Sequence, residues 1–169
     1  GIIDETGHPK KGKHTAGVKR QWCGNTGKLD NCVVSVHTGY VSGDFQCLLD
    51  SDVYLPKEWA ADRPRRRAAH IPDEVVFRTK QEIALDQIGR CLGNGIRVAA
   101  WTFDEFYGRD GSLLSGLDAL GQTYVAEVPC DFTGWVRAPR ILLHPTTWEL
   151  RQPRKHRRYP RLAVTAAPP

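Results

Sequence analysis

The sequence contains no methionine and no long hydrophobic run. No window approaches the ~20 consecutive apolar residues that a membrane-spanning helix needs, and no basic segment followed by an apolar one opens the chain. We therefore expect a soluble protein of the cytoplasm that has no membrane partner. Because the chain begins with Gly1 and not with methionine, we also expect it to be a piece of a longer protein.

Closely spaced cysteine pairs are absent as well. The five cysteines lie far apart in the sequence: Cys23, Cys32, Cys47, Cys91 and Cys130. An odd number is a poor basis for a disulfide framework, and tetrahedral zinc sites usually draw on short-spaced pairs. We interpret these cysteines as structural residues in a reducing compartment.

Positive charge is abundant and clustered. The chain has 169 residues, of which 40% are hydrophobic and 25% charged, enough for one domain with an ordinary core, and its formal net charge is +5. The basic clusters are Lys10, Lys11, Lys13, Lys19 and Arg20; Arg63, Arg65, Arg66 and Arg67; and Arg151, Arg154, Lys155, Arg157, Arg158 and Arg161. Together they point to a polyanion as partner, whereas each cluster alone is equally compatible with a solvated surface.

Two apolar segments each lead into an aspartate. Residues 2–3 precede Asp4, and residues 96–103 precede Asp104. We expect both to be strands that end at their acid, where a carboxylate is held rigidly at a sheet edge. A central strand usually has ~5 to 6 residues, so we expect the sequence to cut into the fold at its N-terminal edge. Strand alternation should turn Glu5 away from Asp4 and leave it structural.

Turn and capping patterns predict the remaining elements. Thr79 and Glu82 form a capping box before a helix, and Asp110 can cap a second one. A further helix should start near Pro56, and the basic residues 60–72 should form an exposed surface insertion. The expected order is strands at 2–3, 31–41 and 45–55, a helix from 79, a strand at 96–103, a helix from 110 and a strand at 123–128.

This order predicts an α/β fold with a mixed sheet. Three antiparallel strands followed by a right-handed crossover helix bring the fourth strand next to the first and parallel to it. Asp4 and Asp104 should then emerge side by side. Two adjacent carboxylates repel one another unless a divalent cation neutralises them, so a magnesium site for phosphodiester chemistry is expected there.

A nucleotide-binding loop is a less favoured alternative. Gly7, Gly12 and Lys13 match the G-x-x-x-x-G-K pattern, but His14 stands where a hydroxyl residue should hold magnesium. Such a loop must open a helix, and residues 15–24 contain two glycines and no helical apolar period.

Several linked motifs closely resemble DDE-type transposases of the insertion sequence 701-like family. They are residues 4–14, 18–24, 27–32, 54–59 and 77–80, and Asp104-x-x-Tyr107-Gly108. The resemblance covers residues 1–150 and implies a partial catalytic domain with a ribonuclease H-like fold, truncated at both ends. The basic tail at 151–169 is expected to be disordered.

The resemblance also implies an activity, metal-dependent DNA strand cleavage and transfer. Asp4 corresponds to the first catalytic acid and Asp104 to the second, and together they would hold two Mg²⁺ or Mn²⁺ ions. The implied partners are transposon ends and target DNA, on which the parent transposase would self-associate. Among the basic residues, those in or just after the loop that leaves the first strand are the candidates for DNA phosphate: Lys10, Lys11, Lys13, Lys19 and Arg20.

The third acid of the family, a glutamate on a later helix, cannot be identified. Glu127 and Glu149 fall on expected strands. We therefore expect the isolated chain to be inactive or nearly so, because residues of one catalytic site act as a unit. The alternative is a noncatalytic basic module that binds nucleic acid, which would need no divalent metal.

Overall fold

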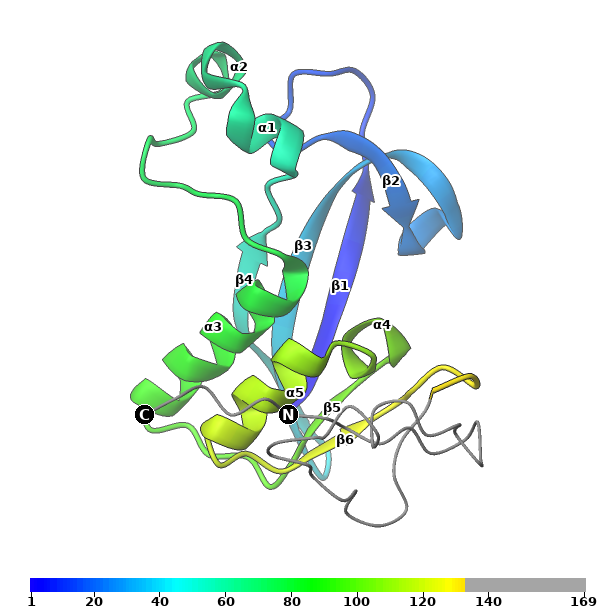
Figure 1. Cartoon of the computed structure of the whole chain (residues 1–169), viewed down its shortest axis with the longest axis vertical. Helices are drawn as coiled ribbons and strands as arrows, with labels where there is room; N and C mark the ends of the chain where they lie inside the picture. The colour runs from blue at the N-terminus through cyan, green and yellow to red at the C-terminus, as the bar shows by residue number, and fades with distance from the viewer. Residues whose placement is uncertain (133–169) are drawn as a thin grey trace, which may run out of the picture. The chain divides into compact units, whose positions relative to one another are not determined.

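The computed structural model describes residues 1–132 (Figure 1). Contacts divide the chain into two units, Gly1–Pro129 and Cys130–Pro169, and the fold described below is that of the first unit. The predicted basic tail at 151–169 lies outside the described residues. Within the described part, no helix has the length and apolar character needed to cross a membrane.

The first unit is a mixed α/β fold, as the sequence predicted. Its strands are β1 (Ile2–Pro9), β2 (Lys19–Cys23), β3 (Lys28–Ser42), β4 (Phe45–Val53), β5 (Trp101–Phe103) and β6 (Tyr124–Ala126). Its helices are α1 (Lys57–Ala61), α2 (Arg63–Ala68), α3 (Lys80–Gly93), α4 (Glu105–Gly108) and α5 (Gly111–Ala119). A 3-10 turn, η1 (Gly24–Thr26), joins β2 to β3.

The six strands form one sheet in the order β2-β3-β1-β5-β6, with β4 also paired to β3. The long strand β3 carries β1 along one edge, and β2 and β4 pair with successive halves of it, all antiparallel. β5 is parallel to β1 and β6 is parallel to β5, which confirms the predicted crossover.

Three strand predictions need correction. β1 does not end at Asp4 but continues to Pro9, because backbone pairing with β3 is unbroken from Ile2 opposite Gly39 to Pro9 opposite Cys32. The prediction of three antiparallel strands also missed β2. Its polar sequence lacks a strand pattern, and pairing with β3 makes it a strand. The predicted strand at 96–103 is shorter and covers only Trp101–Phe103.

The position of Gly7 argues against a nucleotide loop. Gly7 lies inside β1 and packs against β2, where an added Cβ would come within 2.9 Å of Cys23 Sγ. The residues that follow lead directly into β2, and no helix opens there.

Helices α3 and α5 begin where their capping residues predict. The Thr79 hydroxyl accepts the Glu82 N–H at 3.1 Å, and the Glu82 carboxylate accepts the Thr79 N–H, which completes the capping box. Asp110 caps α5. The two helices run side by side over one face of the sheet (Figure 1).

Two apolar clusters lie on opposite faces of β3. The larger joins Ile3 and Val36 to α3, β5 and α5, whereas Val33 packs with Val18, Leu55 and Trp59 in the smaller. Because neighbouring residues of a strand alternate in direction, Val33 and Val36 face opposite sides. The smaller cluster therefore lies on the face that α3 and α5 do not cover.

The sequence predicted that the basic insertion at 60–72 is exposed, and this prediction is wrong for one of its arginines. Arg66 of α2 is 9% exposed and donates to the carbonyl oxygens of Pro72, Asp73 and Val75. A buried guanidinium is tolerated when carbonyls satisfy its N–H groups, so this arginine organises the loop after α2.

All five cysteines are free. Burial, followed by the neighbouring Cys23, raises the pKa of Cys32 to about 11. Cys32 therefore stays a protonated thiol at neutral pH, in keeping with the structural role predicted for it.

Candidate active site

The pairing of β1 with β5 puts the two predicted acids at equivalent positions. Ile2 pairs in parallel with Thr102, and Asp4 and Asp104 each follow two residues later. Ile2 and Thr102 are exposed, whereas the residues between the paired and acidic positions, Ile3 and Phe103, are buried. By alternation, Asp4 and Asp104 belong to the exposed face of the sheet, opposite α3.

Each aspartate keeps one carboxylate oxygen open. Asp4 Oδ1 accepts the backbone N–H of Glu5 at 2.7 Å. Asp104 is the N-cap of α4, and its Oδ1 accepts the N–H groups of Phe106 at 3.0 Å and Tyr107 at 3.3 Å. Among the described residues, no hydrogen bond engages either Oδ2. Both side chains are exposed, so these oxygens are accessible from solvent.

The donor set fits a hard divalent cation, but it is incomplete. Mg²⁺ prefers carboxylate oxygens and commonly uses one or two of them, with water and phosphate oxygens completing its shell. Within residues 1–132, no group of three or more histidine, cysteine or acidic side chains is placed to hold a metal. Glu127 directly follows β6, and Glu149 lies outside the described residues. Asp4 and Asp104 therefore stand as a pair.

Glu5 points to the opposite face from Asp4, as alternation predicted. Its carboxylate pairs with Lys80 Nζ at 2.5 Å and accepts the Tyr107 hydroxyl at 3.3 Å. Lys80 also lies over the rings of Phe106 and Tyr54. Glu5 thus links the segment after Asp4 to the helix that Asp104 caps. The sequence holds no signal for this link, since the two bonds span 75 and 102 positions.

The pKa of Tyr107 depends on the carboxylates of Glu5, Asp4 and Asp104. Burial, followed by the charge and hydrogen bond of Glu5 and the charges of Asp4 and Asp104, raises its pKa well above the usual range. The phenol therefore stays protonated at neutral pH and donates to Glu5.

The turn after Tyr107 packs tightly on the chain that follows β6. At Gly108, an added Cβ would lie 1.9 Å from the carbonyl oxygen of Glu127. Only glycine allows this approach, which holds α4 against β6.

A row of polar side chains extends along the face of Asp4. His37 lies directly across from Asp4 in β3, and its Nε2 is 2.8 Å from Ser35 Oγ, which is 3.1 Å from His8 Nε2. Burial, with a further contribution from His8, lowers the pKa of His37, and the charge of Asp4 opposes that shift.

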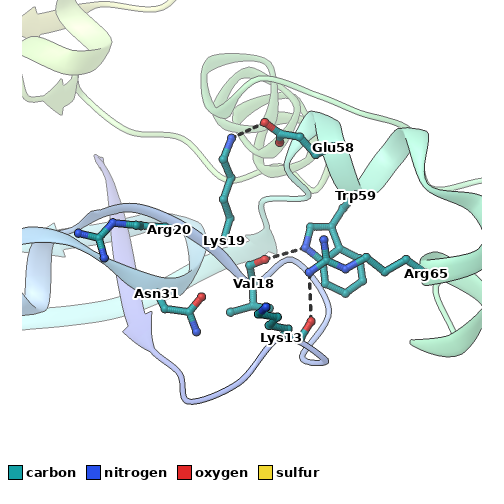
Figure 2. A pocket seen from close by; sticks show the side chains of 8 residues that line it. All are labelled: Lys13, Val18, Lys19, Arg20, Asn31, Glu58, Trp59 and Arg65. Carbon is teal, nitrogen blue, oxygen red and sulfur yellow. Dashed lines mark hydrogen bonds and ion pairs between the residues drawn. The ribbon is translucent and has the colours of Figure 1, made fainter.

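The predicted DNA-binding residues lie at the other end of β1. Lys10, Lys11 and Lys13 are exposed in the loop between β1 and β2, and Lys19 and Arg20 open β2. Some of them line a cavity of about 300 Å³ (Figure 2), whose lining is Lys13, Val18, Lys19, Arg20, Asn31, Glu58, Trp59 and Arg65. Sequence reasoning placed Arg65 in a separate cluster and missed its place beside Lys13, which depends on the fold of α1 and α2.

Comparison with known proteins gives the family of the chain. The chain belongs to the DDE superfamily endonucleases, since the pattern of that family matches residues 1–169. Endonucleases of this superfamily are generally dependent on divalent metal ions.

A relative with a more specific description is the probable transposase for insertion sequence element IS701 of Microchaete diplosiphon. It is 36% identical over 130 residues, which make up 75% of this chain and 31% of that protein. The chain thus spans about a third of the length of this relative. The predicted resemblance to DDE-type transposases is confirmed. No solved structure matches the chain.

Proposed function

We propose that this chain is part of the catalytic domain of a DNA transposase, with a ribonuclease H-like arrangement. In this proposal Asp4 and Asp104 hold the divalent metal for DNA strand cleavage and transfer. The observation that carries it is the parallel register of β1 and β5, which aligns two exposed carboxylates in a member of the DDE superfamily. The name of the relative supports transposition as the reaction.

The chain's own residues supply position and charge. Asp4 is held by a strand paired on both edges, and Asp104 is fixed by the helix it caps. Mg²⁺ or Mn²⁺ bound there would activate the attacking water or 3'-hydroxyl and stabilise the leaving oxygen. Lys10, Lys11, Lys13, Lys19 and Arg20 would neutralise DNA phosphates at the far end of β1.

Within residues 1–132, the two carboxylates leave the site implied by the family resemblance one acid short. We therefore propose that the chain on its own cleaves DNA weakly or not at all, and that the complete transposase acts as an assembly on DNA. The alternative is a basic module that binds nucleic acid without cleaving it. One observation favours this alternative. Residues 1–132 form the whole lining of the basic cavity, but they do not supply a full set of metal ligands.

Binding of Mn²⁺, followed through the loss of its free electron paramagnetic resonance signal, tests the metal site. Asp4→Asn and Asp104→Asn should each weaken binding by more than tenfold, because each removes a charged ligand. Asparagine is also a good N-cap, so Asp104→Asn keeps α4 in place. Asp44→Asn, in the exposed turn between β3 and β4, is the matched control and should bind like wild type.

Nicking of supercoiled plasmid with Mg²⁺, Mn²⁺ or EDTA separates the two functions. Metal-dependent nicking that both site variants lose supports the transposase site. Unchanged Mn²⁺ binding in those variants would contradict it. DNA binding without any Mn²⁺ binding would favour the noncatalytic module.

A further inference from the structure

The cavity at the start of β2 concentrates positive charge from segments distant in sequence. Lys13, Lys19, Arg20 and Arg65 line it, against the single carboxylate of Glu58 (Figure 2). Asn31 adds an amide whose Nδ2 is bonded to Lys10 O and Gly12 O, which holds the loop against β3. The cavity is therefore a shaped cationic site, lined from both the loop after β1 and the α1–α2 segment.

Arg65 is held in place before any ligand arrives. Its guanidinium lies 3.7 Å from the centroid of the Trp59 ring, and its Nη2 donates to Lys13 O at 3.0 Å. Trp59 is in turn 1% exposed and donates through Nε1 to Val18 O at 2.7 Å. A guanidinium has five N–H donors in a planar fork that matches a phosphate group. Because Arg65 uses only one of these bonds among the described residues, most of its fork remains available.

Two other cations of the lining have no acceptor within residues 1–132. The side chains of Lys13 and Arg20 are exposed, and within residues 1–132 no acceptor binds them. Lys19 is different, because its Nζ pairs with Glu58 Oε1 at 2.6 Å. This ion pair joins β2 to α1 and puts one negative charge at the rim.

Part of the cavity lining lies on the same face of the sheet as Asp4. Val18 and Trp59 of its lining pack with Val33, which alternation puts on the side of His37, the residue opposite Asp4. Lys10, bonded to Asn31 of the lining, is six positions beyond Asp4. At ~3.3 Å per residue that distance is ~20 Å, which is the axial length of about six nucleotides for a duplex that lies parallel to β1.

We propose that this cavity binds a phosphate of the DNA backbone about six nucleotides from the phosphate that reaches Asp4. The proposal rests on the proposed function for the choice of DNA as ligand and for the position of the cleaved phosphate. Arg65 supplies the fixed fork, Lys13 and Arg20 close over the phosphate, and Glu58 weakens the site by its charge.

Binding to a fluorescent 30-base-pair duplex, measured by anisotropy in EDTA over a range of salt concentrations, tests the cavity apart from the metal. The double variant Lys13→Gln, Arg20→Gln should bind about tenfold more weakly at 0.1 M salt, with a shallower salt dependence. Arg65→Gln should have a similar effect. Arg97→Gln, which removes an equal charge from the exposed segment before β5, should lose less than twofold.

Glu58→Gln provides a test by gain of binding. Removing the carboxylate releases Lys19 and takes a like charge away from the phosphate, so affinity should rise about threefold or more. A loss of affinity would overturn the assigned role of the cavity. Circular dichroism of each variant checks that the fold is retained, and the side chains of Lys13 and Arg20 make no hydrogen bond within the described part of the chain.

The spacing has its own test. Fe²⁺ in place of Mg²⁺ with ascorbate cuts DNA next to the bound metal, and single methylphosphonates then locate the neutralised phosphate that weakens binding. Loss of affinity about six nucleotides from the iron cut, absent in Arg65→Gln, supports the proposal. Equal loss in wild type and Arg65→Gln overturns it.

The two proposals fail in different ways. If all the cavity variants bind DNA like wild type, the cavity proposal is wrong and the metal site is untouched. If the variants lose DNA binding but no iron cut appears, the cavity stands and the catalytic proposal falls. If DNA and RNA duplexes bind equally well and Arg65→Gln weakens both equally, DNA is not the specific ligand of the cavity.

Discussion

The sheet face beneath α3 and α5 is closely packed, whereas the face that carries Asp4 exposes side chains of the same strands. Ile3 is 2% exposed and its neighbour Ile2 is 42% exposed. In β6, Val125 is 64% exposed on the open side. Because alternate residues of one strand serve the two faces, the packed face can hold the strands rigidly while the open face leaves two carboxylates accessible.

Substitution of an apolar residue should show the largest difference in stability between the two faces. Trp101→Ala, on the packed face, should lower the free energy of unfolding by about 3–5 kcal/mol through loss of burial and a cavity. Val125→Thr, on the open face, should change it by less than about 0.5 kcal/mol. Urea unfolding measures both. A large loss for Val125→Thr would mean that the open face is covered in solution.

The bridge between the acid-bearing segments should be the next largest contribution. Tyr107→Phe removes the hydroxyl that donates to Glu5 and should lower stability by about 1–2 kcal/mol, because the partly buried carboxylate loses one partner. Tyr40→Phe is the control, since no hydrogen bond of the described part uses its hydroxyl. If Mn²⁺ binding is weaker in Tyr107→Phe but not in Tyr40→Phe, the hydrogen bond on the packed face also supports the acids on the open face.

The capping box of α3 stabilises a helix that covers the packed face, so we expect it to affect stability and not DNA binding. Thr79→Ala should lower stability by about 1 kcal/mol, since the Glu82 N–H loses its acceptor, and Thr79→Ser should restore most of it. Thermal unfolding followed by circular dichroism compares the three proteins. DNA binding should be the same in all of them, and a change would show that the two faces are coupled.

The smallest expected effect is the contribution of His37, on the open face, to the pH dependence of stability. The pKa of His37 is lowered in the folded chain by burial and by His8, so the unfolded chain binds more protons over the pH range between the folded and unfolded pKa values. Stability should therefore fall as pH drops below about 6.5, the usual histidine value, and His37→Gln should reduce this dependence. Titration of the ring by NMR should show a still lower pKa in Asp4→Asn, because a stabilising negative charge is gone.

Local signals predicted the elements of the packed face well. The Thr79 and Asp110 caps, each followed by an apolar helical period, marked α3 and α5, and the parallel crossover followed from their order. β2 and the true end of β1 escaped prediction because pairing with the long β3, and not local composition, makes them strands.

The candidate site was predictable only in its acids. Asp4 and Asp104 each follow an apolar run, which the sequence displays directly. The supporting contacts of Glu5 with Lys80 and Tyr107 join residues far apart and have no local pattern. The arginine cluster at 63–67 also gave no indication of which arginine serves which role. Arg66 is buried within the fold, whereas its neighbour Arg65 lines the cavity.

The close approach of Gly108 to the carbonyl oxygen of Glu127 bears on how mutational tolerance should be interpreted here. Any side chain at this position would push α4, and with it Asp104, away from β6. In a library of random substitutions made in the complete transposase and selected for activity, Gly108 would be as invariant as the acids themselves. Intolerance at this glycine would report the spacing of two backbones, not contact with DNA or metal.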